Sequence, residues 1–222
     1  FDAPSVGGAD LQIVHSLAKW KRMALGLYGF KPGEGLYTDM NAIRRDEETD
    51  NLHSMYVDQW DWEAVINKSD RNTDTLMNTV KKIYGAIKDT QKSVCAKFPV
   101  LQNNLPEDIF FITTQELEDM YPELNQKERE NAIAKEKKAV FLMQIGGKLK
   151  SGEKHDGRAP DYDDWTLNGD IILYYPVLDI AFEVSSMGIR VDEDALVAQL
   201  KEAGCEDRLE RDFHKKLLNY EL

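Results

Sequence analysis

The chain has 222 residues, with 28 Lys and Arg against 40 Asp and Glu, and a formal net charge of −12 at pH 7. This length suits one domain with a sizeable core, and the acidic balance argues against a nucleic-acid partner, which normally needs a basic patch. Cys95 and Cys205 are the only cysteines, so no disulfide framework is expected. The sequence shows no apolar run of membrane-spanning length and no secretory signal, which predicts a cytoplasmic protein without a membrane partner.

The first predicted elements are a short strand, Leu11–Val14, and a helix, Leu17–Leu25, with Ser16 as its N-cap. Three cations, including Lys21, project from the first turns of this helix. Most such runs of cations are solvated helix faces. A glycine-rich link, residues 26–35, follows.

The segment Ile43–Glu63 reads IRRDEETDNLHSMYVDQWDWE and predicts two strands joined by a polar turn at Asp46–Asn51. The first strand is expected at Met40–Arg44, and from Leu52 to Trp62 the apolar period is two, as in a strand. One face then carries Tyr56, Trp60 and Trp62, and the other carries Gln59, Asp61 and Glu63.

The polar residues of this hairpin suit a charged ligand. Arginine binds phosphate as a planar, bidentate clamp, and an Arg-Arg pair stands at the start of the turn. Gln59 and Asp61, two residues apart, can bind an amine or amide on one surface. An ordinary hairpin with a solvated face is the alternative interpretation.

The middle of the chain alternates helices with buried strands. The longest helix, Thr73–Phe98, carries an apolar stripe that indicates core packing. Capping-box patterns at Thr113/Glu116 and Asn125/Glu128 begin two shorter helices. Buried strands are expected at Ile109–Thr113 and Val140–Ile145. Gly146–Gly152 lacks the order of a phosphate loop and is interpreted as a turn.

An acidic segment, Lys154–Trp165, follows with the sequence KHDGRAPDYDDW. It contains Arg158 and Asp163 and few apolar residues. A solvated loop and a functional lid are both consistent with this composition.

A second polar constellation lies between Asn168 and Val191. Strands are expected at Asp170–Tyr175 and Leu178–Val184, and a turn centred between Pro176 and Val177 would place Asp170 opposite Glu183. Two facing carboxylates need a positive group between them, and Mg²⁺ bound with nucleotide phosphates is the obvious candidate. A slipped register that separates the two carboxylates is the alternative. Small polar residues, Ser185 to Arg190, continue the second strand and would let a ligand approach its backbone.

Two helices are expected to end the chain, one capped by Asp192 and running through Ala203, and one over Glu206–Leu218. The strands are short and lack a regular βαβ rhythm. The predicted fold class is therefore α+β, with a mostly antiparallel sheet flanked by helices.

Four blocks together resemble the ammonia-dependent asparagine synthetases, aspartate–ammonia ligases related to class II aspartyl- and asparaginyl-tRNA synthetases. The blocks are HSLAKWKR (His15–Arg22), LHSMYVDQWDWE (Leu52–Glu63), RAPDYDDW (Arg158–Trp165) and SSMGIRVD (Ser185–Asp192). The resemblance implies a class II synthetase-like catalytic domain over residues 1–222, a homodimer, ATP and Mg²⁺. It also implies a reaction in which L-aspartate becomes a β-aspartyl adenylate, which ammonia converts to asparagine.

By position, the resemblance also implies roles for individual residues. Arg44 would clamp the α-phosphate, with Arg45 as the alternative, and His53 and Ser54 would line the nucleotide side. The expected aspartate-binding residues are Ser16, Lys21, Gln59, Asp61, Asp163, Ser186 and Arg190. Arg44, Lys21, Asp163 and Gln59 are the expected catalytic residues. Asp170 and Glu183 are the metal candidates, and Ser185 is expected beside the nucleotide.

The sequence departs from the family pattern at three places. Segments that the family has before Phe1 and after Leu222 are missing from this sequence, and so is a loop near residues 165–167. We expect the intact protein to contain such segments. The alternatives to a ligase are a tRNA synthetase core that activates aspartate or asparagine, and a non-catalytic, synthetase-like binding or regulatory subunit. In all cases, the two polar constellations are expected to face one common hollow.

Overall fold

The structure, a computed structural model, describes residues 2–14, 16–44 and 47–219. The chain forms two compact units, one comprising residues 1–68 and 216–222 and the other residues 69–215. A single catalytic domain over residues 1–222 stays a prediction. The elements in chain order are β1 (Asp2–Ala3), η1 (Pro4–Val6), β2 (Ala9–Asp10), α1 (Ala18–Leu27), β3 (Gly35–Ile43), β4 (Tyr56–Ala64), η2 (Lys68–Asp70), α2 (Thr73–Lys97), β5 (Phe110–Thr113), α3 (Thr114–Met120), α4 (Gln126–Lys137), β6 (Ala139–Met143), β7 (Asp163–Tyr175), β8 (Ile180–Arg190), α5 (Glu193–Glu202), η3 (Glu206–Glu210) and α6 (Asp212–Leu218).

The first unit is built on the antiparallel hairpin β3–β4. The two strands pair over their full length, from Gly35 opposite Ala64 to Ile43 opposite Tyr56. The first strand is therefore longer than the predicted Met40–Arg44. Helix α1 packs against both strands, because its buried side presents small and apolar residues together with Lys21. This packing places Lys21 over the hairpin.

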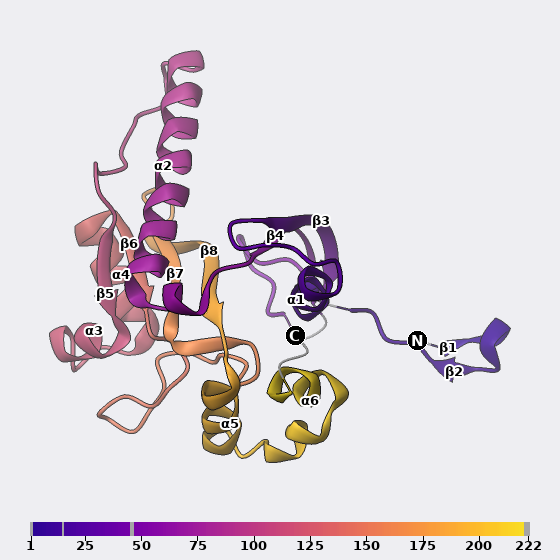
Figure 1. The fold of residues 1–222 in the computed structure, drawn as a ribbon. Coiled ribbons are helices and arrows are strands. Elements are labelled where there is room, and N and C mark those ends of the chain that lie inside the picture. The colour runs from indigo at the N-terminus through magenta and orange to yellow at the C-terminus, as the bar shows by residue number, and fades with distance from the viewer. Residues whose placement is uncertain (1, 15, 45–46, 220–222) are drawn as a thin grey trace. The chain divides into compact units, whose positions relative to one another are not determined.

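The second unit is built on the sheet β5–β6–β7–β8. β5 and β6 are parallel, whereas β6–β7 and β7–β8 are antiparallel. Helix α2 covers one face through residues such as Val80, which packs with Ile171, and α4 covers the other through Ile133, which packs with Ile172. The end of α2 extends beyond the sheet (Figure 1). This mixed arrangement confirms the predicted α+β class with a mostly antiparallel sheet.

Several local sequence signals are confirmed. Both predicted capping boxes form, with Thr113 and Asn125 as N-caps of α3 and α4. The Asp192 side chain accepts a hydrogen bond from the backbone N–H of Ala195 and so caps α5. Residues 146–152 form turns, bends and one isolated bridge from Lys148 to Lys154, without a helix, as expected.

Other predictions were wrong. Residues 11–14 are irregular, and Ile13 and Val14 are exposed, because a short apolar run is stable as a strand only against a neighbouring element. The last predicted helix is divided at Arg211, whose extended backbone separates η3 from α6. The predicted N-cap of α1 is displaced by one residue to Leu17, and the Ser16 hydroxyl instead accepts from the backbone N–H of Ala18 at 3.1 Å.

No helix in the described part of the chain combines the length and the apolar character needed to cross a membrane.

Tyr84 in the α2 core gives a pH-dependent prediction. Its hydroxyl donates to the carbonyl oxygen of Pro106 at 2.7 Å, and burial, with the charges of Glu107 and Asp108, raises its pKa to about 12. The folded-state pKa lies above the unfolded value near 10, so this stability is complete below pH 10 and is lost as the pH rises to about 12. We expect Tyr84→Phe to be less stable than wild type by about 1 kcal/mol at pH 8. Urea unfolding at pH 8, 10 and 11.5 should show this advantage of the wild type decrease steadily as the pH rises, and a constant difference would contradict the assignment.

Candidate functional site

The β3–β4 hairpin has one buried face and one exposed face. The inner face includes Met40, Ala42 and Glu63, all buried. Gln59 and Asp61 lie on the same face as Glu63 because side chains alternate along a strand. On the outer face, Tyr56 and Trp62 are exposed, and Trp60 retains 82% of its accessible surface. The predicted division of the strand into aromatic and polar faces is thus confirmed, and the polar face is the inner one.

Lys21 and Asp61 form an ion pair on this inner face. Lys21 is 0% exposed, and its Nζ donates to Asp61 Oδ2 and to Thr38 Oγ1, the latter at 3.3 Å. Thr38 lies directly opposite Asp61 in the hairpin register. A buried ammonium group requires such partners, because removing it from water without them costs on the order of several kcal/mol. The resemblance assigned Lys21 and Asp61 to one aspartate site, and sequence reasoning missed Thr38, which the alternation of β3 puts on the same face.

Arg44 stands at the loop end of the hairpin, just after the last residue of β3. Its backbone N–H donates to the carbonyl oxygen of Met55 at 2.7 Å, and its Nη2 donates to Gln59 Oε1 at 3.5 Å. The Arg44 side chain is exposed and available to a ligand. The alternative phosphate clamp, Arg45, lies outside the described residues.

His53 and Ser54 organise the turn between the strands. Asp50 Oδ1 accepts from the backbone N–H groups of Leu52 and His53, each at 2.7 Å, and lies 2.9 Å from His53 Nδ1. These hydrogen bonds hold the pKa of Asp50 below its usual value, and the two from the backbone have the largest effect. Ser54 Oγ accepts from the backbone N–H of Tyr56 at 3.2 Å. Both residues expected at the nucleotide therefore also order the turn.

The register of β7 and β8 corrects the predicted pairing. Asp170 lies opposite Ser186, and Glu183 lies opposite Ile172. Tyr175 pairs with Ile180, so the turn holds four residues, 176–179, where two were expected. Asp179 occupies the left-handed region with φ of 56°. A bulge at Val184 then shifts the register by one further residue.

The bulge gathers the predicted polar residues on one face of the sheet. Asp170 and Ile172 share a face because they are two residues apart on β7. Their partners Ser186 and Glu183 therefore share it too, and Asp170 and Glu183 become diagonal neighbours. Ser185 lies opposite Ile171, on the other face, so it does not join this group.

The face is negatively charged despite one arginine. Arg158 pairs with Asp170 Oδ1, while burial raises the pKa of Asp170 against the effect of that arginine. Glu183 retains solvent contact, yet the surrounding protein and the charge of Asp170 raise its pKa to about 7. Glu130 of α4 adds negative charge near both.

The donor set suits a hard divalent cation that keeps other ligands. No group of three acidic, His or Cys residues able to hold a metal occurs among the described residues. Two carboxylates on one face, with Ser186 beside them, are nevertheless the typical protein contribution to a Mg²⁺ site that phosphates and water complete. Asp170 and Glu183 therefore fit a Mg²⁺ ion that keeps phosphate and water ligands. They do not fit an ion whose ligands all come from the protein.

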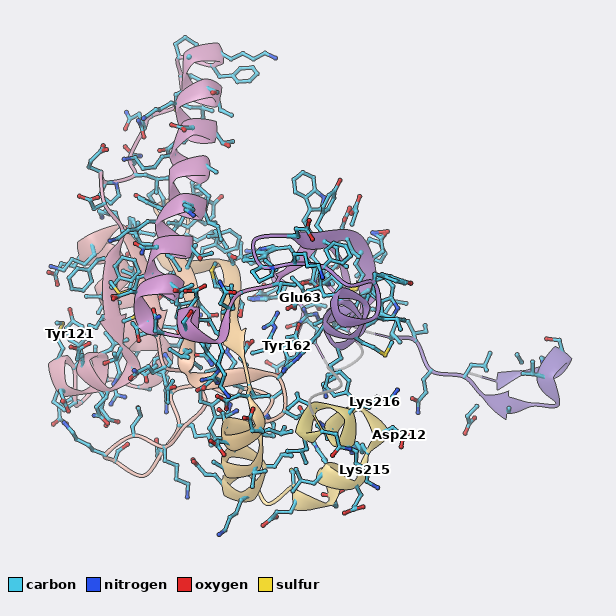
Figure 2. All side chains as sticks on the ribbon, in the orientation of Figure 1. Glu63, Tyr121, Tyr162, Asp212, Lys215 and Lys216 are labelled. Atoms are coloured by element: carbon cyan, nitrogen blue, oxygen red, sulfur yellow. The ribbon has the colours of Figure 1, made fainter. Side chains whose placement is uncertain are left out.

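Asp163 and Arg190 form a neighbouring pair. The Asp163 carboxylate accepts from Arg190 Nη1, and the Arg190 guanidinium lies 3.7 Å from the ring centroid of Tyr162, which Figure 2 labels. Asp161, Asp163 and Asp164 are all buried. The alternative of a solvated loop for Lys154–Trp165 was therefore wrong at its C-terminal end, which is anchored in the fold.

Gly188 makes room for Asp163, and this gives a second prediction. A Cβ added at Gly188 would lie 2.9 Å from Asp163 Cγ and 2.8 Å from Asn168 Cβ. We expect Gly188→Ala to lower the free energy of unfolding by about 1–3 kcal/mol because the side chains must shift. Gly85→Ala is the control, since nothing lies within 4 Å of its added Cβ, and should stabilise α2 by about 0.5–1 kcal/mol. Equal effects of the two substitutions in urea unfolding would contradict this.

The chain is similar in sequence to known proteins. The family model described as "Aspartate-ammonia ligase" matches residues 1–222. A protein of Ruminiclostridium cellulolyticum named aspartate–ammonia ligase is 70% identical over 222 residues, which are 100% of this chain and 66% of that protein. A protein of the same name from Clostridium perfringens is 63% identical with the same coverage of both chains. The chain thus spans slightly less than two thirds of the length of these relatives.

Solved structures share the fold. Aspartyl-tRNA synthetase from Entamoeba histolytica superposes with a TM-score of 0.62 at 14% identity, covering 92% of this chain and 44% of that one. The asparaginyl-tRNA synthetase of the same organism, in complex with asparaginyl-adenylate, gives 0.58 at 12% identity, covering 93% and 48%. These similarities show the class II synthetase fold. A common hollow for the two polar constellations stays a prediction.

Proposed function

The chain belongs to the aspartate–ammonia ligase family, and on that premise we propose that its protein makes L-asparagine from L-aspartate, ammonia and ATP. The observation that carries this proposal is the family match over all 222 residues. The polar clusters of the hairpin and of the β7–β8 face support it, because they offer the charges that adenylate chemistry needs.

In the first step, a side-chain carboxylate oxygen of aspartate bonds to the α-phosphorus of ATP. The bond from that phosphorus to the bridging oxygen breaks, and pyrophosphate leaves. Negative charge concentrates on the phosphoryl oxygens, so cations and positioning matter more than a protein nucleophile. We assign the α-phosphate to Arg44, whose exposed guanidinium can form two parallel hydrogen bonds.

Aspartate itself is assigned to the Lys21–Asp61 pair and to Asp163 with Arg190. Lys21 Nζ can bind a substrate carboxylate while Asp61 binds its ammonium group. Gln59, on the face of Asp61, and Ser186, on the face of Asp170, can each donate or accept a hydrogen bond. Burial of Lys21 fixes its ammonium in place, so little reorganisation is needed when substrate binds.

Asp170 and Glu183 would hold Mg²⁺, which when bound neutralises phosphate charge. The protein contributes two carboxylates whose mutual repulsion a cation relieves. Arg158 stays paired with Asp170 and so orients that carboxylate.

In the second step, the ammonia nitrogen bonds to the acyl carbon, the acyl–oxygen bond breaks, AMP leaves, and one proton is released. We further propose that the enzyme is a homodimer of the cytoplasm that needs no nucleic acid. Aspartate and ammonia are then its small-molecule partners.

The test is a product assay with the intact protein. We expect pyrophosphate release with aspartate and ATP, and asparagine only when ammonium is added. Transfer of labelled amino acid to tRNA would favour a synthetase instead, and the absence of both reactions would favour a non-catalytic binding protein. Either result would overturn the proposal.

Glu183→Gln tests the cation assignment. At pH 8 the substitution removes one of two repelling charges, so we expect the free protein to gain about 0.5 kcal/mol of stability. The Mg²⁺ concentration for half-maximal activity should rise by about tenfold or more. Glu123→Gln makes the same charge change at an exposed position and should alter neither. An unchanged Mg²⁺ requirement in Glu183→Gln would remove this residue from the cation site.

A further inference from the structure

The hydrogen-bonded ladder between β7 and β8 is interrupted next to Asp163. Asp163 pairs with Arg190, but the next pair is Asn168 with Gly188. β7 advances five residues over this interval and β8 advances two, so residues 164–167 have no partner residue on β8. Buried main-chain groups in such a gap need other hydrogen-bond partners.

Gln199 of α5 supplies one of these partners and also bonds to the chain just before the gap. Its Oε1 accepts from the backbone N–H of Trp165 at 2.8 Å. Its Nε2 donates to the carbonyl oxygens of Asp163 at 2.9 Å and of Pro160 at 3.1 Å. Gln199 is 7% exposed, and both N–H groups and the oxygen of its amide are used. The three bonds span the backbone on both sides of Asp163.

The helix that carries Gln199 is itself fixed. Leu196 and Leu200, next to it on the buried side of α5, are 0% exposed. Arg71 bonds both to Asp164 in the gap and to Asp192, the N-cap of α5. The amide of Gln199 is therefore a rigid point to which the gap is attached.

We propose that Gln199 is a positioning residue that sets where the Asp163–Arg190 pair stands, and through it the affinity for aspartate. Gln199 bonds only to main-chain atoms in this segment, and it acts by fixing the peptide from which the Asp163 carboxylate projects. The Asp163 carboxylate packs tightly against Gly188, so a small shift of the backbone moves the Asp163–Arg190 pair. The inference rests on the proposed function and on the role assigned there to Asp163.

Two substitutions separate positioning from simple loss of stability. Gln199→Met removes all three hydrogen bonds while keeping a side chain of similar length. Gln199→Glu keeps an acceptor for Trp165 but loses both donated bonds, and it serves if the methionine variant does not fold. Thr114→Val is the matched control, because it removes a buried hydrogen bond, from Thr114 Oγ1 to the carbonyl oxygen of Gln144 at 2.8 Å, at a residue given no part in binding.

Steady-state kinetics of asparagine formation in the intact enzyme are the test. We expect the KM for aspartate to rise by about tenfold or more in both Gln199 variants, with the KM for ATP within about twofold of wild type. Thr114→Val should lower the melting temperature and leave both constants unchanged. In hydrogen exchange, the Trp165 amide should lose protection in Gln199→Met.

Four results would overturn the inference. An unchanged KM for aspartate in folded Gln199 variants would show a purely structural role, even if Trp165 exchanges faster. Equal rises for both substrates, or the same rise in Thr114→Val, would show a general loss of integrity. Wild-type protein that makes no asparagine would overturn the proposed function first, and this inference with it, so the two failures are distinguishable.

Discussion

Replacing Lys21 by methionine is expected to lower kcat/KM for aspartate by about 10²–10³-fold. The substitution keeps the unbranched apolar stem and removes the ammonium that contacts Asp61 and Thr38. It also leaves the carboxylate of Asp61, which is 17% exposed, without its buried partner. We therefore expect a loss of about 3 kcal/mol in the free energy of unfolding. Urea unfolding and initial rates at several aspartate concentrations measure the two effects.

A second substitution separates those two effects. In Lys21→Met with Asp61→Asn, the uncompensated charge is gone, so stability should return to within about 1 kcal/mol of wild type. Activity should not return, because the groups that bind aspartate are still absent. Lys88→Met is the matched control: Lys88 is also buried and bonds to Glu107, but it lies in α2, so it should lose stability without a change in KM. Recovery of activity in the double variant would remove Lys21 from the aspartate site.

The hairpin shows which features of the site can be predicted from the sequence. Its alternation of aromatic and polar residues from Tyr56 to Glu63 determines which side chains share a face, and the structure confirms that division. Burial of the polar face does not follow from alternation alone. It arises because α1 brings Lys21 onto that face, a tertiary contact that offsets the cost of burying Asp61.

The β7–β8 pair shows what could not be predicted from the sequence. Asp170 and Glu183 were predicted to face each other as metal candidates, but their register depends on turn length and on one bulge. Asp179 adopts a left-handed conformation and lengthens the turn, although Pro176 favours a shorter one. A bulge has no composition of its own, because any residue with space can leave the ladder. Gln199 was missed for a related reason, since its partners are main-chain groups that carry no sequence signal.

Arg44→Ala is expected to lower kcat by about 10³-fold or more with little change in stability. The exposed side chain makes one long hydrogen bond, to Gln59 at 3.5 Å, so its loss should change the free energy of unfolding by no more than about 0.5 kcal/mol. An arginine that stabilises the charge of a transferring phosphoryl group contributes on the order of 10³–10⁵-fold. Exchange of labelled pyrophosphate into ATP in the presence of aspartate measures this step alone.

Arg45→Ala and Arg44→Lys determine whether position or charge matters. Arg45 is the adjacent residue with the same side chain, so a near-normal exchange rate in Arg45→Ala would assign the clamp to Arg44, and the reverse pattern would assign it to Arg45. Lysine keeps the positive charge of Arg44 but offers no planar pair of donors, so Arg44→Lys should recover at most about tenfold of the lost rate. Full recovery would mean that charge alone suffices at the α-phosphate. Because Arg44 contributes little to folding, every change in this series reports on the phosphoryl step and not on the stability of the hairpin.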